Sequence, residues 1–151
     1  FELRWAAMGQ GLLTGSTLNL AQLVATIARG GASRPLRTVH QSAGEIVPLQ
    51  SARPFMEPAA ADLLASYMAG VTGSRATPLP SLGVAGKTGT ASVADKPNNG
   101  WYVGFKPWAG PTSATGRASG ETALVIAVLV EGGRTSARAA ELSYHLFNEL
   151  G

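Results

Sequence analysis

The 151-residue sequence contains no cysteine, which excludes disulfide bonds and thiolate metal sites within it. Histidine is scarce: the only two are His40 and His145, and each is better explained as a surface or packing residue than as a catalytic base. No apolar run reaches the roughly 20 residues that a membrane span needs. From these absences we expect neither a metal centre nor a bound cofactor.

Charge is also low. Charged residues make up 14% of the sequence and the net charge is +3, with the arginines scattered along the chain. Nucleic-acid binding is therefore not expected, because it needs a concentrated basic surface. The hydrophobic content of 45% is that of a globular protein. A chain of this length is one domain or part of one, burying about two-thirds of its unfolded surface.

The sequence Lys-Thr-Gly lies inside an apolar, β-prone run, Val84–Val93. In a strand, Thr88 and Thr90 would share one face while Lys87 and Gly89 share the other. We expect the two hydroxyls and the ammonium to converge on a small volume suited to a carboxylate. Gly89 would let a ligand approach the backbone closely, and the amide of Thr90 could donate to an oxyanion.

Two other interpretations of this motif stay open at this point. An isolated Lys-Thr-Gly is equally compatible with a solvated strand edge. The residues also resemble a phosphate-binding loop in which Ser81 replaces the first glycine, with Leu124–Val130 and Glu131 as a magnesium-holding strand end. Such a loop must open directly into a helix. Gly89 and the β-branched Thr90 disfavour that helix.

The first half of the chain predicts two helices. Ser16 or Thr17 can cap a helix that ends at Gly30, and Pro58 suits the first turn of another. The first would bury Leu20, Leu23, Val24 and Ile27, and the second a stripe of Ala60, Leu63, Leu64, Tyr67, Met68 and Val71. Short strands are expected at Leu36–His40 and Glu45–Leu49.

The second half predicts a β-meander closed by a helix. A turn over Asp95–Gly100 would join the Lys-Thr-Gly strand to an antiparallel strand at Trp101–Phe105. Ala109–Gly120 is expected to form a loop. Thr122–Val130 is almost continuously apolar, which predicts a strand buried on both faces at the centre of the sheet. Ser136–Leu150 has a broad apolar helical face that would cover the sheet.

These segments occur in an order and spacing that resemble one known family, the transpeptidase domain of penicillin-binding proteins, and in particular the C-terminal half of that domain in the class B enzymes. Val84–Ala91 is similar to the family's Val-Ala-Gly-Lys-Thr-Gly-Thr-Ala without a gap. The other similar segments are Met8–Gly11 (a Gly-Gln-Gly turn), Ser16–Asn19 (where the family has Thr-Pro-Leu-Gln), Arg29–Gly31, Trp101–Pro107 and Ile126–Gly133.

The resemblance implies an α/β (α+β) fold, with the antiparallel sheet of penicillin-binding proteins and serine β-lactamases and a C-terminal helix packed on it. Residues 1–151 would be the C-terminal part of one such domain, incomplete in this chain. It would comprise a helical part over about 16–72, a β-meander over about 83–131 and a terminal helix over about 136–150.

The resemblance also implies a function in bacterial peptidoglycan synthesis. The family's serine attacks the D-alanyl-D-alanine bond of a stem peptide, and a neighbouring amine resolves the acyl-enzyme into a cross-link. β-Lactams acylate the same serine. The expected partners are stem peptides, β-lactams and membrane proteins of cell-wall synthesis. The expected location is the outer side of the cytoplasmic membrane, with an anchor that this chain does not contain.

Site residues follow from the resemblance position by position. Lys87 would supply positive charge beside a proton-relay serine and the substrate carboxylate. Thr88 and Thr90 would hold that carboxylate, and the Thr90 amide would serve the oxyanion hole. Gly89 would keep the strand clear of the substrate. Thr77–Leu82 and Asp95–Asn99 would shape access to the site.

The family's other two motifs, Ser-x-x-Lys and Ser-x-Asn, occur nowhere in the sequence. Because covalent catalysis needs the nucleophile, the chain alone is expected to form no acyl-enzyme. Three explanations stay open: a fragment of a longer chain, which we favour because the sequence begins at Phe1 without a start signal; one half of a split enzyme; or a natural remnant. A non-catalytic module that binds peptidoglycan peptides or β-lactams is the alternative function.

Overall fold

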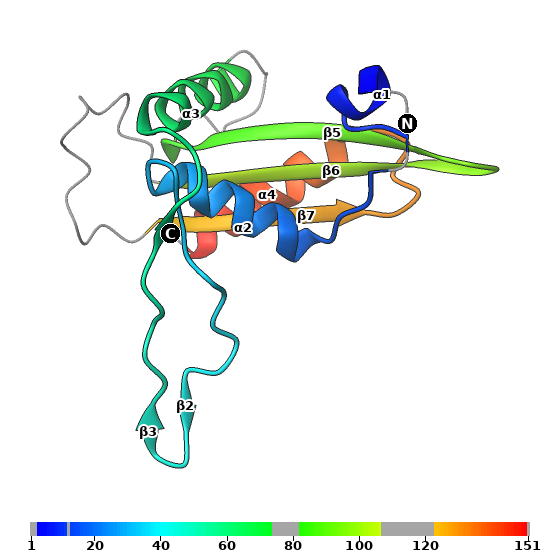
Figure 1. Cartoon of the computed structure of the whole chain (residues 1–151). Helices are drawn as coiled ribbons and strands as arrows, with labels where there is room; N and C mark the ends of the chain where they lie inside the picture. The colour runs from blue at the N-terminus through cyan, green and yellow to red at the C-terminus, as the bar shows by residue number, and fades with distance from the viewer. Residues whose placement is uncertain (1–2, 12, 74–81, 107–122, 151) are drawn as a thin grey trace.

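The core of the fold is a three-stranded antiparallel sheet. We describe it from a computed structural model, which covers residues 3–11, 13–73, 82–106 and 123–150. The strands are β5 (Ala85–Val93), β6 (Lys96–Lys106) and β7 (Leu124–Val130), in the order β5-β6-β7. Helices α2 and α3 lie on one face of the sheet and α4 on the other (Figure 1). This layered α/β arrangement with a packed C-terminal helix confirms the expected fold class.

Four helices are described: α1 (Leu3–Ala7), α2 (Thr17–Ala28), α3 (Pro58–Gly73) and α4 (Ala137–Leu150). Helix α2 begins with a capping box in which the Ser16 side chain accepts from the Asn19 amide, and the Asn19 side chain accepts from the Ser16 amide. The predicted cap at Ser16 is therefore confirmed. Across the residues that the structure covers, none of the helices is both long and apolar enough to cross a bilayer.

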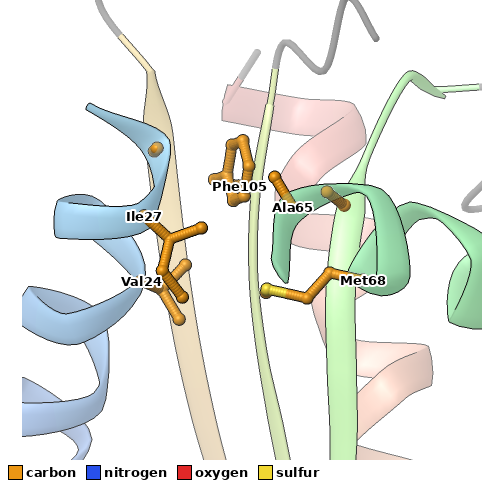
Figure 2. Packing of buried hydrophobic residues seen from close by; sticks show 7 residues of the cluster. Val24, Ile27, Ala65, Met68 and Phe105 are labelled. Carbon is orange, nitrogen blue, oxygen red and sulfur yellow. The ribbon is translucent and has the colours of Figure 1, made fainter. Parts of the chain in front are cut away.

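The alternation of side chains along β6 divides the core into two clusters. Phe105 points toward α2 and α3, where it packs with Ala85, Val24, Ile27, Ala28, Ala65 and Met68 (Figure 2). Tyr102 points to the other face and packs with Phe147 of α4, the two rings meeting edge to face at 6.4 Å. Burying apolar groups on both faces holds the sheet between two helical layers.

The contact face of α3 differs from the predicted one. The buried positions are Ala61, Ala65, Met68 and Thr72, whereas the larger Leu63, Leu64 and Tyr67 are 41–64% exposed. Met68 is buried as predicted, but the prediction was wrong for Leu63, Leu64 and Tyr67, because the helix is apolar on more than one side and periodicity does not select one. Small alanines let the helix backbone come close to the sheet, and this decides which side is buried. On α2, Leu23 is likewise exposed, while Val24 and Ile27 are buried as predicted.

The segment between α2 and α3 forms an arm that extends away from the sheet (Figure 1). At its base β1 (Ala32–Ser33) pairs with β4 (Arg53–Pro54), and at its tip β2 (Gln41–Ser42) pairs with β3 (Glu45–Ile46). The predicted strand at Leu36–His40 is absent, and the one at Glu45–Leu49 is limited to its first two residues. The arm has only two ladders of two residues per strand and no larger sheet for these residues to join, so their β-propensity is not realised.

Strand β7 lies at an end of the described sheet rather than at its centre, and β6 is the central strand. Within the described residues, the prediction from the apolar run Thr122–Val130 was therefore wrong on position. It was also wrong on burial, because in β7 only Ile126 is buried and the other residues are half-buried. The residues of β7 are apolar on both sides because α2 contacts one face and α4 the other. Coverage of both faces demands apolar residues at every position, whether or not a strand is flanked on both edges.

The hairpin that joins β5 to β6 is tighter than predicted. Residues 96–100, expected to be a turn, are part of β6, and the reversal takes place at Ala94 and Asp95. Asp95 has φ +56°, a left-handed conformation that Asp adopts more readily than most residues with side chains. The end of this hairpin extends beyond β7, because β7 pairs only with Gly100–Lys106. The predicted loop at Ala109–Gly120 lies outside the described residues.

Candidate functional site

The four residues Lys87, Thr88, Gly89 and Thr90 lie in the middle of β5, where the strand passes from the core to the surface. Ala85 is fully buried, Lys87 is exposed, Gly89 is half-buried and Thr90 is exposed. Since α2 and α3 pack against the Ala85 end, this part of the strand is the part left accessible. The sheet therefore presents the motif at the margin of its helical cover.

The two threonines share a face of β5, as the alternation predicts, but they differ in exposure. Thr88 lies opposite Tyr102 in the register and is only 6% exposed, because that face carries the α4 core. Thr90 lies opposite Gly100 and is exposed. Of the two hydroxyls, that of Thr90 is therefore the one that the described structure leaves open to a ligand.

The ammonium of Lys87 lies at the outer edge of β5. Its Nζ donates to the carbonyl oxygen of Thr88 at 2.6 Å. On the same edge, the carbonyl oxygen of Thr90 accepts from the side-chain amide of Gln10 at 3.0 Å. Neither of these donors belongs to β6, so both carbonyls point away from the neighbouring strand.

The direction of these carbonyls also fixes where the amides point. In an antiparallel strand the N–H and C=O of one residue point to the same side. The N–H groups of Thr88 and Thr90 therefore face the outer edge too, where the described sheet has no further strand. An N–H donor at Thr90, a hydroxyl on the same residue and an ammonium from Lys87 thus meet at one edge. This set can bind an anion or a developing oxyanion.

Gly89 differs from the other glycines of the sheet. A Cβ added to Gly86 would lie 2.1 Å from the Tyr102 hydroxyl, and one added to Gly100 would lie 2.2 Å from the Thr135 carbonyl oxygen. A Cβ at Gly89 would meet only Trp101 Cβ, at an ordinary 3.6 Å. Packing among the described residues thus requires glycine at the first two positions and leaves room for a side chain at Gly89.

The structure excludes the phosphate-loop interpretation. Such a loop places the first turn of a helix directly after its Lys-Thr, so that helix N–H groups face the phosphates. Here Lys87–Val93 continues as a strand paired with β6. Within the described ranges, no three His, Asp or Glu side chains gather at a possible metal site either.

Two further segments were expected to shape access to the site. Asp95–Asn99 forms the end of the β5–β6 hairpin and is tied to the turn after β7, where Asn99 Oδ1 accepts from the amide of Gly132 at 2.9 Å. Of Thr77–Leu82, only Leu82 falls within the described residues. Sequence reasoning missed the contact of Gln10 with this strand; the glycines on either side of Gln10 were the signal that could have indicated it.

Residues 2–140 match the family model described as the penicillin-binding protein transpeptidase domain. Among solved structures, penicillin-binding protein A from Mycobacterium tuberculosis aligns over 97% of this chain, with a TM-score of 0.78 and 24% identity. Its imipenem acyl-enzyme complex aligns over 92% of the chain, with a TM-score of 0.69 and 26% identity. Its penicillin G acyl-enzyme complex aligns over 87%, with a TM-score of 0.65 and 25% identity.

The chain covers only 34%, 31% and 29% of these three structures, about a third of their length. A search of curated proteins found no match. The structural likeness at 24% identity shows the shared fold, and the family match extends over almost the whole chain.

Proposed function

Because the chain belongs to the family of penicillin-binding protein transpeptidase domains, we propose that it forms one wall of a peptidoglycan D,D-transpeptidase site. The wall is the outer edge of β5. The nucleophile, in the Ser-x-x-Lys motif, and the Ser-x-Asn motif would come from a part of the enzyme that this sequence does not include. The site would lie on the outer side of the bacterial cytoplasmic membrane, where stem peptides are cross-linked.

The observation that carries the proposal is the orientation of Thr90. Its carbonyl accepts a bond from outside the sheet, so its N–H points to the same free edge. When a serine oxygen attacks the D-alanyl-D-alanine carbonyl, negative charge develops on the carbonyl oxygen. A fixed N–H aimed at that oxygen stabilises the transition state. D-Alanine leaves with the proton taken from the serine, and an incoming amine then displaces the serine to form the cross-link.

The other groups of the edge bind rather than react. Lys87 places its ammonium within 2.6 Å of the Thr88 carbonyl, and a cation there attracts the terminal carboxylate of the stem peptide or of a β-lactam. The exposed hydroxyl of Thr90 can donate to the same carboxylate. Thr88 would assist through its hydroxyl only if the buried side chain gained access to the ligand.

Gly89 supports the same function, because the packing of the described residues does not require a glycine at this position. Glycine weakens a strand, and a glycine where the described residues leave room for a Cβ fits a position that a ligand approaches closely. A substrate lying against the β5 edge is such a neighbour. An added methyl group at Gly89 is expected to obstruct this ligand while leaving the folded chain intact.

The proposal is tested by acylation with a fluorescent penicillin followed by intact mass measurement. The chain alone should acquire no adduct. Together with the half that carries Ser-x-x-Lys, in one polypeptide or as two chains, the adduct should appear on that half. A covalent adduct on the present sequence would contradict the proposal. Reversible binding by the chain alone, without acylation in either form, would support the binding module instead.

Two variants at one position separate the roles of Thr90 in the complete enzyme. Thr90→Pro removes the outward N–H without breaking a bond to β6, and proline is tolerated at such an edge position. Loss of an oxyanion donor should slow acylation by about 100-fold or more. Thr90→Val keeps the N–H and removes the hydroxyl, so it should mainly weaken ligand binding. Equal acylation rates for the two variants would contradict the oxyanion role.

A further inference from the structure

The Gly-Gln-Gly turn near the start of the chain holds a glutamine side chain against the candidate site. Gln10 Nε2 donates to the carbonyl oxygen of Thr90 at 3.0 Å, joining residues 80 positions apart. In Figure 1 the N-terminal segment with α1 lies beside the end of β5. The contact is made to the one residue whose amide the proposed function requires.

The turn itself is built to hold this glutamine. The amide of Gln10 donates to the carbonyl of Trp5, the central residue of α1, at 2.8 Å. Gly9 and Gly11, on either side, have φ values of +72° and +80°, which residues with side chains rarely adopt. The bond to Trp5 and this turn conformation place Gln10 beside β5, and the carboxamide is then held by its bond to the Thr90 carbonyl.

Thr90 lies where such support is needed. Thr90 pairs with Gly100 of β6, which in turn pairs with Val130 of β7. Going toward the hairpin turn, Gly100 is the last residue of β6 that has this second partner. Beyond this position the hairpin has only two strands, and its register shifts between Ala91 and Val93. The sheet therefore stops supporting β5 at the residue whose N–H must be aimed most accurately.

We infer that Gln10 is a positioning residue for the Thr90 amide. The side-chain amide takes the place of a neighbouring strand, and by fixing the Thr90 carbonyl it fixes the N–H on the same side of the same residue. This inference rests on the proposed oxyanion role of Thr90. According to this inference, the Lys-Thr-Gly strand does not orient the Thr90 amide by itself. It also needs a hydrogen-bond donor from the Gly-Gln-Gly turn.

The structural part of the inference is tested by NMR on the complete enzyme, labelled with 15N. Gln10→Glu preserves size, but its carboxylate cannot donate near pH 7, so the bond to the Thr90 carbonyl is lost and the Thr90 amide signal should shift. Lowering the pH through about 4 protonates the carboxyl group, which can then donate, and the Thr90 signal should return toward its wild-type position. Gln10→Met, which cannot donate at any pH, should show no such return.

Gln41 provides a matched control. Its Nε2 donates to the carbonyl of Gly44 at 2.9 Å, the same kind of bond, at the end of the arm. Gln41→Glu should leave the Thr90 signal unchanged at every pH. An unchanged Thr90 signal in Gln10→Glu, or a change of equal size in Gln41→Glu, would overturn the inference.

The functional part uses the complete enzyme. Gln10→Glu should lower the rate constant of acylation about fivefold, the effect of one neutral hydrogen bond, with little change in the affinity of the initial complex. If Thr90→Pro slows acylation but Gln10→Glu does not, Gln10 has no positioning role. If Thr90→Pro itself has no effect, the oxyanion proposal fails, and the NMR result then reports only the local structure of the edge.

Discussion

The hydroxyl of Tyr102 is a buried polar group without a hydrogen-bond partner among the described residues, and its removal provides a quantitative test of the core. Tyr102 is 1% exposed, and its Oη lies between Gly86 and Gly104, where an added Cβ would approach it to 2.1 and 2.6 Å. An unpaired hydroxyl in such a place costs about 1–3 kcal/mol, because its bonds to water are lost on folding and not replaced.

Tyr102→Phe removes this cost and keeps the edge-to-face contact with Phe147. The space left by one oxygen atom forfeits packing worth up to about 1 kcal/mol. The net expectation is a gain of about 1 kcal/mol in the free energy of unfolding, or about 3 °C in Tm for a chain of this size. Urea unfolding followed by circular dichroism measures it. Tyr67→Phe, at an exposed residue, should be neutral.

The same substitution should also change how the free energy of unfolding depends on pH. Burial raises the pKa of Tyr102 above its ordinary value of about 10. Above that value the unfolded chain loses the proton while the folded chain keeps it, so stability should fall by about 1.4 kcal/mol per pH unit from this group. Tyr102→Phe should remove that component of the slope. If Tyr102→Phe instead destabilises the protein by about 1 kcal/mol or more, the hydroxyl is hydrogen-bonded in the folded state, and an unchanged slope would mean that it is in contact with water. Either result refutes the reasoning.

Three other substitutions test the local packing and capping. Gly86→Ala should lower the free energy of unfolding by about 2–3 kcal/mol because its Cβ would overlap the Tyr102 hydroxyl. Gly70→Ala, in α3 with open space around it, should raise that free energy by up to about 1 kcal/mol, and urea unfolding that ranked the two alanines equally would contradict the packing. Ser16→Ala removes the acceptor for the Asn19 amide and should cost about 1 kcal/mol in thermal unfolding; an unchanged Tm would mean that the capping box adds no stability.

The sequence predicted the elements that depend on neighbouring residues. Ser16 as a cap, Pro58 as a helix start and the strand through Lys87 are local signals, and each appears where expected. The prediction was less accurate where β-propensity lacked a sheet to join, as at Leu36–His40, and where an apolar run such as Thr122–Val130 was interpreted as a central strand.

The residues of the candidate site were predicted as a set, but their geometry was not. Alternation correctly placed Thr88 and Thr90 on one face of the strand. It could not show that α4 and Tyr102 bury Thr88 while Thr90 stays exposed, because exposure depends on what packs against each end of the strand. The direction of the Thr90 amide also became known only from the bond that its carbonyl accepts.

The sequence alone determined the family resemblance, the Lys-Thr-Gly strand and the starts of α2, α3 and α4, because periodicity, capping and turn chemistry act over a few residues. It did not predict α1. Only the tertiary structure decided which side of α3 is buried, that β7 lies at the end of the described sheet, and that Gln10 contacts Thr90. These features depend on contacts between segments far apart in the chain. No local pattern specifies such contacts, because they are selected by how the whole core packs.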